Sequence, residues 1–415
     1  MPFWINVLVG VLAFAVAALG GKALIPWLHK LKFGQPIKVE FGPKWHANKQ
    51  GTPTMGGILF IVGSIVATAA GYAVYRMTSS VDVTAISGNR EALRVMSCVI
   101  FCLLFGIIGF IDDFAKVAKK QNEGLTPKQK LALQVVAAIL WLAAMYWLGD
   151  RSTTIDLVFV RFDIRWFYYP VMVLVILYLT NAVNLTDGVD GLCGTVTLVA
   201  MLIFTLICSR LQMTSYTLFT MALAGGCLGF LVWNLHPAKC FMGDTGSMFL
   251  GAAVASVGLA THQHLVLILV ALVYILEALS VMIQVTYFKY TKKKYGEGRR
   301  IFKMTPIHHH FEMSGWGEVR ANACITSYMN GYKDPRRSAY FTKQAAGFSE
   351  DYVGVRSGSW VAPSPSDYQN YSNLMITTDK TLPQPVMYAA EAAFLRAEGE
   401  LKGWDMQGDA ETFYE

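Results

Sequence analysis

Residues 93–113 read Leu-Arg-Val-Met-Ser-Cys-Val-Ile-Phe-Cys-Leu-Leu-Phe-Gly-Ile-Ile-Gly-Phe-Ile-Asp-Asp. About 20 apolar residues in an α-helix cross a bilayer core about 30 Å thick, so this run predicts a membrane span. It ends on two adjacent acidic residues, Asp112 and Asp113. Adjacent carboxylates repel each other and are costly to desolvate at a membrane surface, which favours a divalent cation or a catalytic role. The alternative is a solvated helix end beside the basic Lys116.

The front part of the chain repeats this apolar pattern. The 415 residues are 54% hydrophobic and 15% charged, whereas a soluble protein carries about 25% charged residues. The long apolar runs predict an all-α polytopic membrane protein with about nine transmembrane helices. No basic segment or cleavage pattern accompanies the first run, so we expect a retained span rather than a signal peptide. The expected spans are 3–25, 55–75, 93–111, 131–149, 167–184, 191–208, 216–234, 247–263 and 265–288.

Lysine and arginine are divided unevenly between alternate loops. One set of loops holds the lysine-rich segments 30–49, 116–130 and 289–303, and the other holds only scattered arginines such as Arg151 and Arg210. Because Lys- and Arg-rich loops stay in the cytoplasm, the N-terminus is predicted to be periplasmic. We expect a bacterial inner-membrane protein that contacts membrane lipids, has its active site on the cytoplasmic face and has no nucleic-acid partner.

Two polar stretches lie at cytoplasmic ends of expected spans. Asn181-Ala-Val-Asn184-Leu-Thr-Asp187-Gly-Val-Asp190-Gly is expected in a short loop, and its density of polar groups favours a binding site over a simple polar turn. The second stretch runs from Asn234 to Ser247 and contains Gly243-Asp244-Thr. Asp244 fits either a helix N-cap or a metal ligand whose other ligands are phosphate oxygens.

Two further segments carry histidine and lysine. His308, His309 and His310 follow the ninth expected span. Three consecutive histidines cannot all face one way on a helix, so contacts with diphosphate or sugar oxygens are favoured over a three-His metal site. Lys49 precedes a Gly-rich turn that fits a phosphate contact or a helix entry capped by Thr54 equally well.

The combination of these groups at one membrane face is more informative than any single motif. Asp112, Asp113, Asp190 and Asp244 are expected there together with Asn, Lys and His side chains. A diphosphate donor and a phosphate acceptor repel each other because both are anionic. Mg²⁺ would neutralise that charge and orient both groups, and a base would free the acceptor oxygen for attack.

These stretches, in order along residues 1 to about 320, resemble the motifs of the phospho-N-acetylmuramoyl-pentapeptide transferases (MraY). This family is a branch of the polyprenyl-phosphate N-acetylhexosamine-1-phosphate transferase superfamily. The uninterrupted His308-His309-His310 favours it over WecA-like relatives, whose motif is His-Ile-His-His. The matching segments are Gly51-Thr-Pro-Thr-Met-Gly-Gly57, Asp112-Asp-Phe-Ala-Lys116, Asn184-Leu-Thr-Asp-Gly-Val-Asp-Gly-Leu192, Phe241-Met-Gly-Asp-Thr-Gly-Ser247 and Thr305-Pro-Ile-His-His-His-Phe-Glu312.

The resemblance implies the first membrane step of peptidoglycan synthesis. UDP-MurNAc-pentapeptide and undecaprenyl phosphate would give lipid I and UMP with Mg²⁺, by a single displacement or by covalent two-step catalysis. Asp244 would be the metal ligand, and Asp112 or Asp113 would serve near the acceptor phosphate, one of them as base. The family also suggests a homodimer. The remaining substrate-binding residues that the resemblance implies are Lys49, Lys116, Lys119, Asn184, Asp187, Asp190, Asn234, His308, His309 and His310.

The pattern changes near residue 320. No apolar run follows that could form the family's tenth span, and the net charge changes from positive to negative. Residues 321–415 instead resemble a fragment of the SusD/RagB-type lipoproteins, which are soluble, helical and exported. We expect a mostly helical or irregular soluble tail. Because the two parts belong to different compartments, an artefactual junction near residues 319–322 is favoured over a true fusion.

Three other functions are compatible with parts of the sequence. A WecA-like enzyme would use UDP-GlcNAc instead of the MurNAc donor, and an inactive chimera would result if the tenth span were needed. A transporter or lipid flippase would place ionisable groups near the midplane of the bilayer and often show repeated halves. Here the acidic groups lie at helix ends and no internal repeat is visible. A sugar-binding module is suggested by the tail alone.

Overall fold

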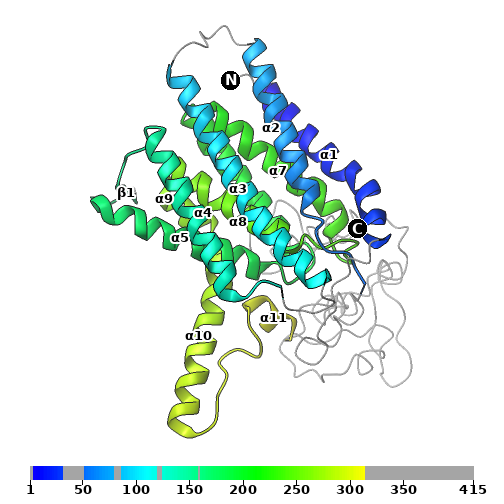
Figure 1. Cartoon of the computed structure of the whole chain (residues 1–415), viewed down its shortest axis with the longest axis vertical. Coiled ribbons are helices and arrows are strands. Elements are labelled where there is room, and N and C mark those ends of the chain that lie inside the picture. Colours follow the sequence, from blue (N-terminus) through cyan, green and yellow to red (C-terminus); the bar gives the residue numbers. More distant parts are fainter. Residues whose placement is uncertain (1–2, 31–50, 79–85, 119–123, 158, 314–415) are drawn as a thin grey trace, which may run out of the picture. The chain divides into compact units, whose positions relative to one another are not determined.

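The computed structural model describes residues 3–30, 51–78, 86–118, 124–157 and 159–313. The expected tail at 321–415 therefore lies outside the described residues, as do Lys49 and Lys119. The described part is built almost entirely of helices (Figure 1). They are α1 (Phe3–Lys30), α2 (Ile58–Thr78), α3 (Ile86–Ala118), α4 (Pro127–Trp147), α5 (Tyr168–Thr186), α6 (Leu192–Arg210), α7 (Thr214–Asn234), α8 (Gly243–Ala260), α9 (His264–Val270), α10 (Leu272–Tyr295) and α11 (Ile307–Glu312).

Eight of these helices, α1 to α7 and α10, are long and apolar enough to cross a membrane. The chain is therefore a multi-pass membrane protein, as its composition predicts. The expected span 247–263 corresponds to α8, which is not among the eight because its first turn, Gly-Asp-Thr-Gly-Ser, is polar and glycine-rich. The last expected span is interrupted at Ala271, between α9 and α10.

A small hairpin is the exception to the all-helical architecture of the described residues. Strand β1 (Thr154–Asp156) pairs antiparallel with β2 (Arg161–Asp163), with Ile155 opposite Phe162. The hairpin lies in the connection between α4 and α5 and precedes a 3₁₀ turn at Arg165–Phe167. With three residues in each strand, it does not change the predicted class.

Helix α8 forms the centre of the bundle. Every residue of α8 except Asp244 is buried, and α3 and α5 pack along it. On the other side α7 packs against α1, α2 and α6, with α1 and α2 adjacent to it in Figure 1. A Cβ at Gly225 of α7 would come within 2.2 Å of the carbonyl oxygen of Gly10, so the close approach of α7 and α1 requires glycine there.

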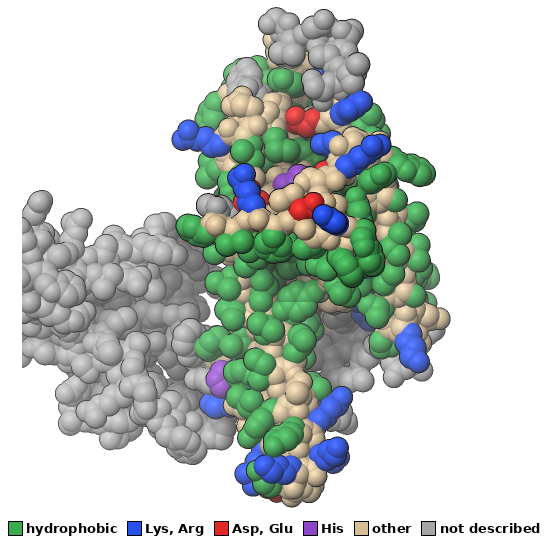
Figure 2. All heavy atoms as spheres, turned by 90° about the vertical axis from the view of Figure 1, so that its left-hand side faces the viewer, with side chains coloured by type: hydrophobic (Ala, Val, Ile, Leu, Met, Phe, Trp, Pro, Cys, Tyr) green, Lys and Arg blue, Asp and Glu red, His purple; other side chains and the backbone are tan. Residues whose placement is uncertain are grey.

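Helix α10 extends below the rest of the bundle, and α11 lies beside it (Figure 1). Its outer face is apolar over most of its length, whereas Lys and Arg gather at its lower end (Figure 2). Gly296, with a φ of 80°, ends the helix in the left-handed conformation that glycine adopts readily. Lys292, Lys293 and Lys294 in the last turn complement the negative end of the helix dipole.

Helix ends from distant parts of the sequence meet at the level of the acidic motifs. The C-termini of α3, α5 and α7 and the N-termini of α4, α6 and α8 share this end of the bundle, because consecutive spanning helices alternate in direction. Helix α4 begins with a capping box, in which Thr126 and Gln129 satisfy each other's backbone N–H groups. That cap sets the position of the first turn of α4, which carries Lys130.

Candidate active site

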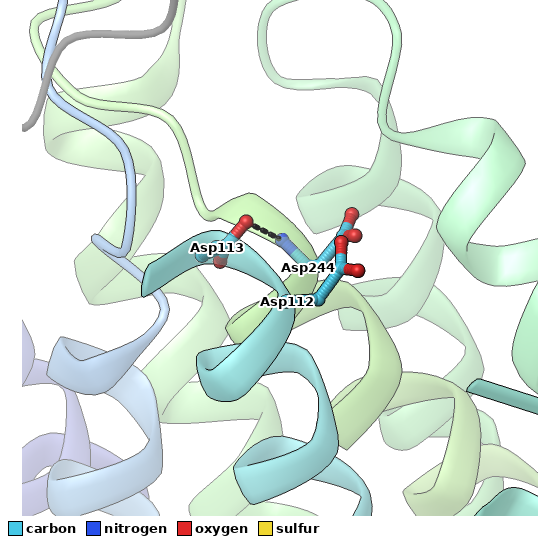
Figure 3. Close-up of side chains that lie close together, drawn as sticks. All are labelled: Asp112, Asp113 and Asp244. Carbon is cyan, nitrogen blue, oxygen red and sulfur yellow. Dashed lines mark hydrogen bonds between the residues drawn. The ribbon is translucent and has the colours of Figure 1, made fainter. Parts of the chain in front are cut away.

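The two adjacent aspartates at the end of α3 point in different directions (Figure 3). Asp113 is 1% exposed and turns toward the start of α8. Its Oδ1 accepts the backbone N–H of Asp244 at 3.2 Å, and its Oδ2 accepts the backbone N–H and the hydroxyl of Thr245 at 2.9 and 2.8 Å. Asp113 thus satisfies N–H groups that the first turn of α8 leaves without helical partners.

Asp112 faces a different set of groups, although it is also buried. Its Oδ1 accepts the backbone N–H of Leu125 at 2.8 Å, and its Oδ2 lies 2.6 Å from the Nζ of Lys116. Asp112 therefore connects the end of α3 to the segment that enters α4.

Asp244 lies between two lysines. Its Oδ2 is 2.8 Å from Nζ of Lys116 on α3 and 2.9 Å from Nζ of Lys130 on α4. Its Oδ1 accepts a hydrogen bond from Nδ2 of Asn184 at 2.8 Å, and the same Nδ2 lies 2.8 Å from the Oγ of Ser247. Asp244 lies inside the first turn of α8, which begins at Gly243, and its carboxylate bonds go to Lys116, Lys130 and Asn184, so the alternative of Asp244 as a simple N-cap does not hold.

These three carboxylates form a candidate divalent-metal site. Asp112, Asp113 and Asp244 each offer an oxygen within 4.8 Å of the others. Hard carboxylate oxygens suit a cation such as Mg²⁺, which is usually held by one or two carboxylates plus substrate oxygens. Asp113 uses both oxygens to hold the first turn of α8. Asp112 and Asp244 face lysine ammonium groups, which a cation could replace, so they are the better ligands. Among the described residues, the ammonium groups of Lys116 and Lys130 balance much of the negative charge of these three carboxylates.

The segment after α5 differs in one respect from expectation. Helix α5 continues to Thr186, so Asn181 and Asn184 lie on its last turns rather than in a loop. Asn181 bonds Gln134 of α4 at 2.9 Å, whereas Asn184 reaches Asp244. The polar residues at 181–191 thus lie on the last turns of α5 and in the short turn that follows, and two of them contact α4 and α8.

Asp187 caps α5 and is partly buried beside the metal-site carboxylates. Its pKa is raised well above the ordinary value, first by desolvation and then by the negative charges of Asp244, Asp113 and Asp190. The carboxyl therefore lies in a field that disfavours its ionised form unless a cation is near.

Asp190 and Asn234 tie the turn at 187–191 to the loop that leads into α8. Asp190 accepts hydrogen bonds from the backbone of Ala238 at 3.2 Å and meets Nδ1 of His236 at 3.0 Å. Asn234 accepts the N–H of Gly191 at 3.1 Å and donates to the carbonyl of Cys240 at 3.0 Å. Both side chains thereby hold the turn at 187–191 against the loop that precedes Asp244.

The Gly-rich segment at 51–57 also lies against the start of α8. The N–H groups of Gly56 and Gly57 donate to the carbonyls of Phe241 and Met242 at 2.8 and 3.1 Å. Thr54 does not cap α2, since its buried hydroxyl has no hydrogen-bond partner among the described residues. Of the two alternatives for this turn, the Thr54 cap is therefore excluded.

The His tract occupies α11, which packs against α10. His308 is buried and bonds Glu277 of α10, whereas Nδ1 of His310 accepts the N–H of Lys303 at 3.1 Å. His309 is partly exposed and lies 4.2 Å from His308 between ring centroids. The three rings therefore have three different surroundings, as expected for consecutive helix positions.

Comparisons with known proteins identify the family to which this chain belongs. A model described as Glycosyl transferase family 4 matches residues 95–262, and Phospho-N-acetylmuramoyl-pentapeptide-transferase signature 1 matches residues 49–61. Proteins named Phospho-N-acetylmuramoyl-pentapeptide-transferase from Acetivibrio thermocellus and Carboxydothermus hydrogenoformans are 42% and 43% identical to the chain. These alignments cover 77% and 74% of this chain and 91% and 90% of the relatives. The chain belongs to the phospho-N-acetylmuramoyl-pentapeptide transferase family. A relative of the same name from Shouchella clausii is 43% identical and is covered over 93% of its length.

A second family match lies at the other end of the chain. A model described as Susd and RagB outer membrane lipoprotein matches residues 296–415, in agreement with the resemblance of the tail. A solved SusD-like protein from Bacteroides thetaiotaomicron is 30% identical over 73% of this chain and 53% of its own. Its TM-score of 0.19 is too low to support any structural argument.

The structure adds to the candidate site a residue that sequence reasoning missed. Lys130 makes the same contact with Asp244 as the expected Lys116, at 2.9 against 2.8 Å. In the sequence it is one of several lysines attributed to the positive-inside pattern. The capping box at Thr126 was the available signal, because it places Lys130 in the first turn of a helix at the cytoplasmic end.

Proposed function

We propose that this transferase moves phospho-MurNAc-pentapeptide from UDP-MurNAc-pentapeptide to undecaprenyl phosphate, releasing UMP and forming lipid I. The observation that carries the proposal is the identity of 42–43%, over 90–93% of their length, to relatives named for this transfer. The carboxylate and lysine cluster at one end of the helices supplies the chemistry that two anionic substrates need.

The reaction exchanges one phosphorus–oxygen bond for another. An oxygen of the polyprenyl phosphate attacks the sugar-linked phosphorus of the donor, and the bond to the bridging oxygen breaks as UMP leaves. A bound Mg²⁺ would neutralise the diphosphate and the charge that develops on UMP. Asp244 and Asp112 would hold that ion, and Lys116 and Lys130 would move from Asp244 to substrate oxygens.

Asp112 is the better candidate for the group near the acceptor phosphate. Asp113 uses both oxygens to hold the start of α8, which leaves it less free to contact the acceptor phosphate. Asp112 is fixed through one oxygen by Leu125 and presents the other to Lys116. Asn184, Asp187 and the His tract would contact the donor from the other side of Asp244.

The active site would face the cytoplasm of the bacterial inner membrane. It lies at the end of the bundle toward which α10 runs, and the exposed cluster Lys292, Lys293, Lys294, Arg299 and Arg300 lies in and after the last turn of α10 (Figure 1). Positive residues mark the cytoplasmic side, and nucleotide-activated donors are found there. The polyprenyl chain would lie along the apolar outer surface, and a homodimer remains a prediction.

The test is UMP release from UDP-MurNAc-pentapeptide and undecaprenyl phosphate by the full chain in detergent, with and without Mg²⁺. Asp244→Asn should abolish release, whereas Asp163→Asn, in the exposed hairpin strand β2, should leave it unchanged. Release that is independent of Mg²⁺ or survives in Asp244→Asn would refute the assignment. Equal use of UDP-GlcNAc in a competition experiment would favour the WecA-like alternative.

A further inference from the structure

His308 of α11 and Glu277 of α10 form a buried pair next to Gly188, in the turn between α5 and α6. His308 is 7% exposed and Glu277, on α10, is 3% exposed. Nδ1 of His308 lies 3.0 Å from Oε2 of Glu277, and the backbone N–H of His308 donates to the same oxygen at 3.3 Å. One carboxylate therefore fixes both the backbone and the ring of His308.

The charges of this pair depend on each other. Glu277 lies in the apolar first half of α10, and among the described residues its ion-pair partner is His308. A buried carboxylate is costly unless a partner balances its charge. A carboxylate only accepts hydrogen bonds, so Nδ1 must carry a proton. Nε2 is a donor in the form of the ring that carries a proton on both nitrogens, and that form supplies the positive partner of Glu277.

The second ring nitrogen of His308 points at the turn that carries Asp187. Nε2 is buried and has no hydrogen-bond partner among the residues that the structure describes. A Cβ placed on Gly188 would lie 2.2 Å from Nε2, so only glycine leaves room for the ring. A buried polar nitrogen in this position requires a partner, and the turn at 187–191 adjoins Asp244 and the predicted donor site.

We propose that Glu277 is a positioning residue of the transferase site, which holds His308 as an imidazolium whose Nε2–H donates to an anionic oxygen of the nucleotide-sugar donor. This role rests on the proposed function. Glu277 acts through His308 and does not itself touch the donor. In many metal and hydrolase sites a carboxylate binds one ring nitrogen of a histidine and thereby orients the other nitrogen toward the metal or the reacting group. Glu277 and His308 have the same arrangement.

The test is a double-mutant cycle in the full chain, with the dissociation constant of UDP-MurNAc-pentapeptide as the first readout and the KM and kcat of UMP release as the second. Glu277→Gln keeps the size and one acceptor oxygen but removes the charge. Loss of one charge-assisted hydrogen bond should weaken donor binding about tenfold, and His308→Gln should do at least the same. The double variant should bind no more weakly than His308→Gln, because Glu277→Gln keeps an acceptor oxygen for the backbone N–H of His308 and the lost charge acts only through the ring.

Ser280→Ala is the matched control. Ser280 is buried one turn further along α10, and its hydroxyl donates within the helix to the carbonyl of Glu277 at 2.7 Å. Donor binding should be unchanged in this variant. The proposal is overturned if Glu277→Gln binds the donor within twofold of the wild type, or if the double variant shows the product of the two single effects.

The same cycle separates this proposal from the proposed function. If the wild-type chain does not turn over UDP-MurNAc-pentapeptide, the assigned reaction fails. The role of Glu277 is then decided by titration with UDP, which offers the same kind of anionic diphosphate oxygens. Weaker UDP binding in Glu277→Gln would support the positioning role, and equal binding or no binding to the wild type would overturn it.

Discussion

Asp113 on α3 accepts the backbone N–H of Asp244 on α8 at 3.2 Å (Figure 3). The bond joins two residues 131 positions apart in the sequence. Through it, and through its contacts with Thr245, the side chain of Asp113 fixes the first turn of α8 and hence the direction in which the side chain of Asp244 points. The two carboxylates have separable tasks, although both belong to one acidic cluster.

Asp113→Asn should lower stability more than it changes metal dependence. An amide cannot accept all the N–H and O–H groups that the carboxylate accepts, and an unsatisfied buried group costs about 1–3 kcal/mol. We expect a lower melting temperature in detergent, with a Mg²⁺ midpoint for UMP release close to that of the wild type. An equally large shift of the Mg²⁺ midpoint in Asp113→Asn and in an Asp112→Asn variant would contradict this division of tasks.

Lys130→Gln should lower UMP release about a hundredfold, as for loss of one positioned group that stabilises transition-state charge. Lys130 contacts Asp244 at 2.9 Å and is partly buried. Lys128 is exposed and lies two residues earlier on the same helix, so Lys128→Gln serves as the matched control. The measurement is kcat/KM for both variants in the same membrane preparation, and similar values for the two would remove Lys130 from the site.

Gly188→Ala should disrupt donor binding without unfolding the bundle. The added Cβ would lie 2.2 Å from Nε2 of His308, so the ring or the turn must shift. Gly106→Ala on α3 is the control, since its Cβ would find no atom nearer than 3.5 Å. We expect a KM for UDP-MurNAc-pentapeptide raised at least about tenfold in the first variant only. Unchanged kinetics in Gly188→Ala would show that His308 is free to move.

Asp187→Asn should stabilise the metal-free protein at neutral pH. The folded state raises the pKa of Asp187, so between the ordinary carboxyl pKa of about 3.9 and the raised value the folded state binds more protons than the unfolded state. Stability then falls as pH rises through this range, and the asparagine variant avoids that loss. In EDTA at pH 7 the melting temperature of Asp187→Asn should be higher than that of the wild type, and the difference should shrink toward pH 4. A lower melting temperature for Asp187→Asn at pH 7 would contradict the electrostatic argument.

The tail should be separable from the transferase part. We predict that cleavage at a protease site inserted after Arg320 leaves residues 1–320 in the membrane and leaves UMP release as it is in the uncut chain. Sedimentation of membranes after cleavage, followed by the release assay, measures both. Loss of activity on cleavage, in a chain that is active before it, would mean that residues beyond 320 contribute to the site.

The sequence by itself determined the class of the protein and the end of the helices at which its polar motifs gather. Runs of about 20 apolar residues must form helices in a bilayer because lipid offers no partners for the backbone. Since successive spans alternate in direction, the polar motifs at 112–113, 184–191 and 234–247 had to meet at one end. Those two rules need no knowledge of how the helices pack.

Only the tertiary structure decided what each polar residue does. Asp112 and Asp113 are neighbours in sequence, but 100° of helical rotation turns one toward Lys116 and the other toward α8. In the sequence Lys130 looks like any lysine of a cytoplasmic loop, and Glu277 like an isolated charge in a membrane span. Their roles are visible only in the fold, which places Lys130 beside Asp244 and Glu277 beside His308. The physical reason is that the sign and distance of a neighbouring charge set the role of an ionisable group, and those neighbours come from helices far apart in the chain.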